Sequence, residues 1–456
     1  MNLNNVSGIK TTETRLGLKL LVIGFVILLL LIPLTMIGKI AGERKERALT
    51  TEEDIISMNG GRPAVIGPVM IVPVSIMERG ENNVLYAIKR NIVILPAVLD
   101  ISGDMKTEMR SRGIYKVPLF SGTIFLKASF SEAHEKLERL LFTEQYTADW
   151  DNAWYAVELK DKRSLKSTPL ISVDGAQTLT MKGSESALGW EGSSVTAKAG
   201  NKGRDSRVDI SFGFGGGGSL DVYPFGESVK CAITSDWKAP SFTGYVVPTD
   251  YAITDSGFNA SWFIPDSAQP YPNAFLAGKS DINFSNTSFG VNFFQPVSVY
   301  AKTDRALKYG LLFIIVPFVV FFLFEIFLKR RIHPLQYTLI GFADVLFYLI
   351  LLSFSEHLPF MASYATGAAS VCLLVAFYSA SILGNWKRGL VMIPTLGGIY
   401  LYLYVALESE DYALIVGAIG VFAMLACFMT VTRKIDWYAL SLPGKKEIKI
   451  AEESGE

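Results

Sequence analysis

Asp344 is the ionisable residue with the most unusual surroundings in the sequence, because it is the tenth residue of an apolar run from Leu335 to Phe354. An ionised carboxylate near the centre of a lipid bilayer costs roughly 2.5–3.5 kcal/mol on insertion scales. The side chain is therefore expected to face protein or water. The sequence leaves open whether it is charged.

The helix that carries Asp344 is predicted to have a partly polar side. At about 100° per residue, four residues fall on the same side as the carboxylate: Tyr337, Gly341, Tyr348 and Ser355. Two interpretations of this stripe remain. It is either a path for protons or another solute, or a hydrogen-bonded packing face with Tyr348 or a neighbouring span as the partner of Asp344. We favour the packing face.

Glu325 lies near the end of a second apolar run, Tyr309 to Leu328, and four residues before Lys329. This spacing favours an ion pair along one helix. A carboxylate at that depth can also bind a partner helix, so both roles are kept as hypotheses.

The three histidines offer little support for a metal site. His333 precedes Pro334, which suits the first turn of a helix, so we interpret His333 as a turn or interface residue. Glu356 and His357 are adjacent in a loop, where a carboxylate and an imidazole could relay protons or bind a cation. Adjacent loop residues need not face each other, which favours a structural role. His134 is predicted to lie on the exposed side of a short helix.

Known catalytic templates are not matched. The sequence contains no GxSxG, HExxH or Walker motif, and the glycine run Gly215 to Gly218 lacks the Lys-Ser/Thr of a phosphate-binding loop. Ser235 and Lys238 match the SxxK pattern of penicillin-binding enzymes, but Ser7 and Lys10 match it equally, and no companion motif is present. We therefore predict no catalytic residues.

Cysteine usage argues against a metal centre or a disulfide framework. The three cysteines are Cys231, Cys372 and Cys427, and no CxxC or Cys/His cluster occurs. The last two lie in apolar runs, so Cys231 has no partner in its own part of the chain. No cofactor is predicted.

The composition is that of an integral membrane protein. Of the 456 residues, 50% are apolar and only 19% charged, against about 25% charged in soluble proteins. The apolar excess is concentrated in runs of membrane-spanning length, which excludes a cytosolic enzyme, a disordered chain and an outer-membrane barrel. Forty-three basic and 43 acidic residues cancel, so nucleic acid is a poor partner.

Six membrane spans are predicted, the first as an uncleaved anchor. The runs are Leu20–Ile37, Tyr309–Leu328, Leu335–Phe354, Met361–Leu383, Leu390–Leu407 and Tyr412–Thr432. Lysine and arginine in alternate short loops predict that both termini are cytoplasmic and that residues 41–305 are outside. Basic residues on the outer side of the first span give the opposite local signal, but long segments cross largely regardless of charge.

Small residues in the later spans predict close helix packing. Ala362, Thr366 and Ser370 recur every four positions, and glycines thin two further helices, at Gly397–Gly398 and Gly417–Gly420.

The external segment is predicted to be β-rich, as a sandwich or two packed β-units. Strand patterns occur at Val65–Ile76, Val84–Leu95, Thr123–Phe130, Asn152–Lys160 and Arg207–Phe214. Turn signals are Asn59–Gly61, Ser102–Gly103, Asp174–Gly175 and Gly215–Gly218. Ser131 to Phe142 is predicted to be helical, with Ser131 as its N-cap.

Five segments follow from these patterns. Residues 1–19 form a cytoplasmic N-terminus, 20–40 an anchor, 41–305 the external β-rich domain, 306–432 a five-helix bundle and 433–456 a cytoplasmic tail.

Short strings through the C-terminal half carry a family resemblance. They are Thr303–Tyr309, Phe321–Glu325, His333–Tyr337, Ser355–His357 and Asp436–Tyr438. Together with the anchor and the long external domain, they resemble the CreD family of bacterial inner-membrane proteins, named for cell-envelope integrity and colicin tolerance. The resemblance implies an inner membrane of Gram-negative type, expression linked in some relatives to a sensor-kinase two-component system, and no catalytic residues.

Some of these strings also have a plain structural interpretation. Thr303 is expected to cap a helix with Asp304 in its first turn. Asp436, Trp437 and Tyr438 follow the last span, where the aromatic residues have the composition of an interfacial belt in contact with membrane lipids.

Three functions from different classes remain. The first is a non-catalytic envelope protein whose external domain binds an envelope protein or ligand. The second is a transporter or proton-coupled permease, argued from the bundle and Asp344. The third is a periplasmic hydrolase of wall or lipid material. We favour the first, because the catalytic motifs are missing and the resemblance points to the envelope.

Overall fold

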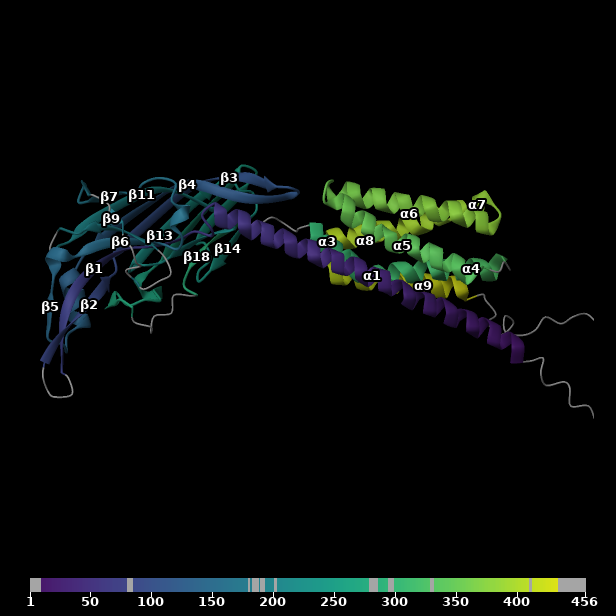
Figure 1. Ribbon diagram of the computed structural model, residues 1–456, viewed down its shortest axis with the longest axis horizontal. Helices are drawn as coiled ribbons and strands as arrows, with labels where there is room; N and C mark the ends of the chain where they lie inside the picture. The colour runs from purple at the N-terminus through teal and green to yellow at the C-terminus, as the bar shows by residue number, and fades with distance from the viewer. Residues whose placement is uncertain are drawn as a thin grey trace, which may run out of the picture. The chain divides into compact units, whose positions relative to one another are not determined.

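The computed structural model describes residues 10–79, 85–178, 181–182, 188, 193–200, 203–278, 286–293, 299–328, 332–409 and 412–433 (Figure 1). The chain divides into two compact units, Arg47–Pro296 and the combination of Met1–Glu46 with Val297–Glu456. We call them the β unit and the helical unit. The boundary falls inside helix α1 (Lys10–Met58), which contributes residues to both.

The helical unit contains the apolar part of α1 and a C-terminal bundle. The C-terminal helices are α3 (Val299–Lys308), α4 (Gly310–Leu328), α5 (Pro334–Ser355), α6 (Phe360–Leu383), α7 (Trp386–Leu390), α8 (Met392–Glu408) and α9 (Ala413–Thr432). Six helical segments of the described chain are long and apolar enough to cross a membrane, and α7 and α8 together make one of them. The predicted arrangement of one anchor and five further spans is confirmed.

Glycine residues allow helices of the helical unit to pack closely at two places. A side chain at Gly341 of α5 would overlap Leu30 of α1 and Phe318 of α4. At Gly420 of α9, a β-carbon would overlap the Tyr402 ring of α8. Glycine therefore sets how closely these helices pack.

The predicted packing stripe on α6 is wrong within the described chain. Ala362, Thr366 and Ser370 are exposed, and their neighbours Ser363 and Gly367 are buried instead. A β-carbon at Gly367 would lie 3.2 Å from the ring of Phe347 on α5. The face of α6 with Ser363 and Gly367 is buried because the bulky Phe347 of α5 packs against it.

The β unit is a sandwich of two sheets, as predicted. The first sheet has the order β14-β18-β12-β1-β6-β10-β9, with β2, β5 and β17 paired off this path, and the second has the order β15-β16-β13-β3-β4-β11-β7-β8 (Figure 1). The strands of the first sheet are β1 (Ala64–Arg79), β2 (Leu85–Ile94), β5 (Tyr146–Ala148), β6 (Trp154–Leu159), β9 (Met181–Lys182), β10 (Ser193–Lys198), β12 (Ser219–Tyr223), β14 (Pro240–Gly244), β17 (Ala274–Leu276) and β18 (Phe289–Phe293).

The second sheet is built from longer antiparallel strands with one parallel pair, β3 with β13. Its strands are β3 (Val98–Arg112), β4 (Tyr115–Phe130), β7 (Leu170–Val173), β8 (Ala176–Thr178), β11 (Ser206–Gly217), β13 (Ser228–Ser235), β15 (Asp250–Thr254) and β16 (Gly257–Ile264). Alternate residues of β3, β13 and β16 are buried. This alternation places one face of the sheet in the core and leaves the other face to solvent.

The main core lies between the two sheets. Residues of β1, β2, β6 and β12 meet residues of β3, β4, β11, β13 and β16 in one cluster. A second cluster covers the opposite face of the first sheet, where Ile66, Val69 and Ile71 of β1 pack with Phe225 and Phe275. Strand β1 is therefore buried on both faces, which explains its nearly unbroken apolar sequence.

One predicted turn is wrong, one is partly right and two are confirmed. Ser102–Gly103 lies inside β3. Gly215–Gly217 continues β11, and the glycine run bends only at Gly218, where φ is 75° before β12 begins. The Asn59–Gly61 and Asp174–Gly175 turns are present, with positive φ at both glycines of the first and at both residues of the second. Glycine adopts such angles at little cost, and aspartate is among the few other residues that do so.

The short helix of the β unit begins later than predicted. Helix α2 spans Ala133–Leu140, and its N-cap is Glu132, which has φ of 55° and makes no side-chain capping bond. Ser131 is therefore not the cap. The Lys136 ammonium is buried and lies 2.6 Å from a Glu227 carboxylate oxygen. This buried contact fixes the helix position in place of a cap.

The glycine run of β11 has a packing role that the sequence did not reveal. A β-carbon at Gly216 would lie 2.5 Å from Pro63 Cδ and 2.6 Å from the Gly61 carbonyl oxygen. One at Gly60 would lie 2.5 Å from the Gly215 carbonyl oxygen. The run is thus a stretch of strand without side chains, over which the segment between α1 and β1 passes in close contact.

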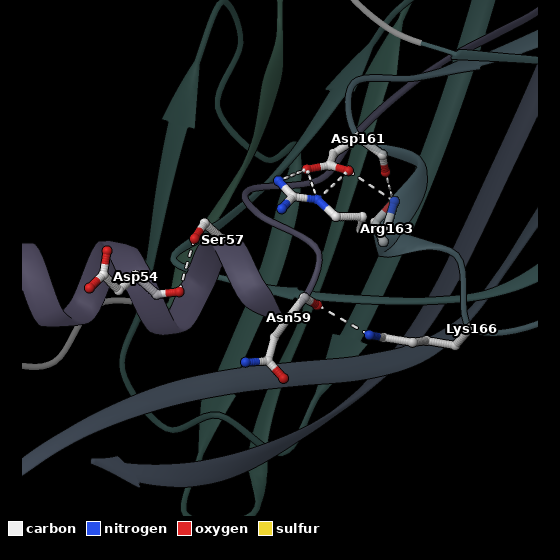
Figure 2. Close-up of polar contacts among 7 residues, drawn as sticks. Asp54, Ser57, Asn59, Asp161, Arg163 and Lys166 are labelled. Carbon is white, nitrogen blue, oxygen red and sulfur yellow. Dashed lines mark hydrogen bonds and ion pairs between the residues drawn. The ribbon is translucent and has the colours of Figure 1, made fainter. Parts of the chain in front are cut away.

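Polar and apolar contacts hold this turn in place. The Lys166 ammonium donates to the Asn59 carbonyl at 3.2 Å, as Figure 2 shows. Beneath it, Ile55 and Ile56 of α1 pack with Val117 and Leu119 of β4. The last turns of α1 are consequently part of the β unit.

We predict that Gly216→Ala destabilises the β unit. The added methyl would meet backbone and ring atoms that cannot rotate away, and overpacking of this kind costs typically about 1–3 kcal/mol. The matched control is Gly213→Ala on the same strand, where the nearest atom is the rotatable Ser167 Oγ at 3.1 Å. Pulse proteolysis of the full chain across a urea series measures the difference. Equal urea midpoints for the two variants would contradict the proposed role of Gly216 in the close approach of the α1–β1 segment.

Candidate functional site

Asp344 lies in the interior of the helical unit and faces protein, as predicted. The residue is 1% exposed. The Tyr400 hydroxyl of α8 donates to Asp344 Oδ1 at 3.5 Å. The partner thus comes from a neighbouring span, which was one of the two predicted choices.

Tyr348, the other predicted partner, does not bond to Asp344. Within the described residues, Asp344 Oδ2 and the Tyr348 hydroxyl are both buried without a hydrogen-bond partner. Aromatic rings pack together nearby: the ring centroid of Phe347 lies 4.7 Å from that of Tyr400 and 5.2 Å from that of Tyr364. The predicted stripe on α5 is buried along its length, which is the geometry of a packing face.

Glu325 is part of a junction between three helices. One of its carboxylate oxygens is paired with the Lys19 ammonium of α1, and the other accepts from the Tyr337 hydroxyl of α5 at 3.2 Å. Lys19 also donates to the Ile332 carbonyl at 3.1 Å. The predicted partner Lys329 lies outside the described residues. Glu325 therefore binds partner helices, which was the alternative role.

His333 is the N-cap of α5. Its Nδ1 accepts from the Leu335 amide at 3.2 Å, and its own amide donates to Gln336 Oε1 at 2.9 Å. Pro334 occupies the first turn, as predicted. Because the ring nitrogen is used for capping, His333 has the turn role expected from the sequence.

Glu356 contacts two other helices, whereas the adjacent His357 does not share these contacts. A carboxylate oxygen of Glu356 lies 3.8 Å from an Arg44 guanidinium nitrogen of α1 and accepts from the Tyr300 hydroxyl of α3 at 3.5 Å. His357 is exposed. The carboxylate thus joins helices, and the neighbouring imidazole takes no part.

Helix α3 begins earlier than predicted, and Thr303 is not its cap. The helix starts at Val299, and the buried Thr303 hydroxyl donates to the Val299 carbonyl at 2.9 Å. Lys302 pairs with Glu408 of α8 at 2.8 Å, and its ammonium lies 5.1 Å from the Phe360 ring centroid. Polar residues of α3 therefore tie it to the helices beside it.

Among the described residues, no group of three His, Cys, Asp or Glu side chains is placed so that it could hold a metal ion. The Ser235 Oγ accepts from the Trp237 amide at 3.3 Å, and Lys238 is exposed. Asp436, Trp437 and Tyr438 lie outside the described residues.

Ionisable groups of the β unit have shifted pKa values for plain structural reasons. Four hydrogen bonds from Arg163, three from its guanidinium and one from its backbone amide, hold the pKa of Asp161 below its usual range (Figure 2). Burial raises the pKa of Asp221, and Lys160 and Arg62 oppose this shift. Burial also raises the pKa of the Cys231 thiol, which keeps it in its unreactive neutral form.

The outer face of the second sheet is an open surface that sequence reasoning did not identify. Outward residues of β3, β4, β13 and β16 are exposed along the middle of the sheet. They include small polar side chains and two large aromatic ones, Phe125 at 47% and Phe263 at 49% exposure. Exposed aromatic side chains on an open face are typical of binding surfaces. The strand alternation could have revealed this face if the register had been known.

We predict that Lys19 and Glu325 are energetically coupled. Lys19→Met or Glu325→Gln alone leaves the other residue without its partner, so each single variant should lower stability and the double variant should recover part of the loss. The expected coupling is about 0.5–3 kcal/mol. Thermal unfolding of the four proteins in one detergent measures it.

The control for this double-mutant comparison is Asp304→Asn. Its pair with Lys308 is exposed, at 56% and 72% for the two side chains, so it should contribute little. Strictly additive effects of the Lys19 and Glu325 changes would show that the junction has no energetic role.

Comparison with known proteins gives a consistent result along the chain. A family model described as inner membrane protein CreD matches residues 15–438. Inner membrane protein CreD of Escherichia coli (strain K12) is 29% identical over 428 residues, which cover 93% of this chain and 94% of the relative. The match includes the anchor, the β unit and the bundle. The chain therefore belongs to the CreD family of inner-membrane proteins.

Proposed function

We propose that the protein is a non-catalytic inner-membrane protein that supports cell-envelope integrity, and that its β unit binds an envelope protein or ligand. The observation that carries this proposal is the open outer face of the second sheet, with its exposed Phe125 and Phe263. The relative's name describes a membrane protein and no reaction.

The polar groups of the helical unit support the same proposal. Lys19, Glu325, Arg44 and Glu356 are engaged in contacts between helices. Such contacts are what a bundle needs for assembly. The transporter alternative depends on Asp344, whose carboxylate is enclosed by aromatic rings and receives one long hydrogen bond from Tyr400. A periplasmic hydrolase remains the third alternative.

We further propose that both termini are cytoplasmic and that the β unit is periplasmic. Lys19 pairs at the junction of α4 and α5, whereas Arg44 pairs with Glu356 at the opposite end of α5. These contacts place Lys19 of α1 beside Glu325 near the end of α4 and beside Ile332 just before α5, and the basic residues 329–331 lie between these two positions in the sequence. The same contacts also neutralise Arg44, one of the basic residues that gave the opposite sequence signal. The positive-inside rule then assigns the basic loop to the cytoplasm.

The sidedness predicts which cysteines a membrane-impermeant thiol reagent reaches in intact cells with a permeabilised outer membrane. In a variant without the native cysteines, Ser111→Cys in the exposed β3–β4 hairpin should be labelled, and Arg330→Cys should be spared. Disrupted cells, in which both should react, are the control. The reverse pattern in intact cells would overturn the orientation.

The proposed binding role predicts that two variants differ in how well they complement a deletion strain that is sensitive to envelope stress. Asp344→Asn keeps a hydrogen-bonding side chain and loses the carboxylate, so it should complement fully. Replacement of residues 60–295 by a short linker should abolish complementation, because it removes the proposed binding surface. Growth under a cell-wall antibiotic measures both.

Immunoblots of the membrane fraction provide the control for insertion and abundance. Loss of complementation by Asp344→Asn at normal protein level, together with full activity of the linker variant, would favour the transport mechanism instead.

A further inference from the structure

A groove crosses the outer face of the second sheet where β4, β11 and β7 lie side by side. Its volume is about 260 Å³. Phe125 of β4 and Leu170 of β7 form its two walls, and both are directly opposite Ser211 of β11 in the strand register. Two strand spacings of about 4.8 Å separate the walls. The small serine between two large apolar side chains creates a slot wide enough for one ring of a ligand.

A polar row lies beside this slot. Asp209 of β11 is opposite Lys127 of β4 on one side and Ser172 of β7 on the other, and Ser172 is opposite Gln177 of β8. All four side chains line the groove. In the part of the chain that the structure describes, Asp209 and Lys127 form no ion pair although they are cross-strand partners. Their hydrogen-bonding capacity is therefore available to a ligand.

The groove recognises its ligand through side chains and not through a strand edge. Strand β11 is paired with β4 and β7, β4 also with β3, and β7 also with β8. Their backbone groups are thus used within the sheet, which excludes the addition of an extended peptide as a further strand at this place.

The charges of the row alternate and cancel. Lys127 lies in register between Asp209 and Asp100, and Asp100 is also opposite Lys230 of β13. A phosphate or carboxylate would therefore meet no excess of positive charge there. A neutral ligand rich in hydroxyl groups is favoured, because a carboxylate accepts hydrogen bonds from hydroxyls and an ammonium donates to them.

We propose that this groove binds a glycan of N-acetylated hexosamine units. A pyranose ring has an apolar C–H face that stacks on an aromatic ring such as Phe125, and its hydroxyls suit Asp209 and Lys127. The acetamido methyl fits the apolar wall at Leu170, and its amide suits Ser172 and Gln177. The volume is below the roughly 300–1,000 Å³ typical of drug-sized ligands, so it suits one or two sugar rings. This assignment rests on the proposed binding role of the β unit.

Titration of the full chain in lipid nanodiscs with chitotetraose, a soluble N-acetylglucosamine tetramer, tests the assignment. Saturation-transfer NMR and calorimetry should detect binding in the millimolar range. Phe125→Ala should weaken it about tenfold or more, since it removes the stacking wall. Ser211→Trp should abolish it by filling the slot. Cellotetraose, which has the same linkage without acetamido groups, should bind at least several-fold more weakly.

The matched control is Tyr86→Ala, because Tyr86 of β2 in the first sheet has the same 47% exposure as Phe125 and does not line the groove. It should bind like the parent protein. The proposal is overturned if the parent protein does not bind chitotetraose, if Tyr86→Ala is as harmful as Phe125→Ala, or if cellotetraose binds equally well. Such a failure leaves the complementation result standing, because that experiment tests the whole β unit and not this groove.

Discussion

Charged side chains inside an apolar helix bundle need partners on other helices, and this constraint orders the helical unit. Unbonded polar atoms cost several kcal/mol in a lipid environment. Lys19 and Glu325 meet this requirement by joining α1, α4 and α5, and Arg44 and Glu356 join α1 to the far end of α5. These pairs join the anchor to the bundle at two levels, although the partners in each pair are more than 300 positions apart in the sequence.

The β unit solves a different problem, because a sandwich has two outer faces. The outer face of the first sheet is covered by a second apolar cluster, so β1 is buried on both sides. The outer face of the second sheet has alternating polar residues and remains open. The two sheets therefore differ in what their outer faces offer, an apolar layer on one side and an open, mainly polar surface with Phe125 and Phe263 on the other.

The sequence predicted the spans and the β class because both depend on local patterns. Apolar runs of membrane length and strand alternation need no knowledge of distant contacts. The partner of Glu325 could not be predicted in this way, because Lys19 is 306 residues away in sequence. The same limit applies to Gly215–Gly217, which looked like a turn and is a strand made bare for the Asn59–Pro63 segment. The groove depends on the register of β7, β11 and β4, which periodicity alone does not give.

The positions of the ionisable groups along α5 bear on the choice between binding and transport. Tyr337, Asp344 and Glu356 are separated by seven and twelve residues, or about 10 Å and 18 Å at 1.5 Å per residue. A proton relay needs donors and acceptors about 3 Å apart. The buried side of α5 between these groups also has the hydroxyls of Tyr348 and Ser355. The Tyr348 hydroxyl has no hydrogen-bond partner among the described residues, and the Ser355 hydroxyl donates to the Leu352 carbonyl of its own helix. Each polar group therefore lies at its own level of the bundle, an arrangement that suits three separate helix contacts better than one continuous path.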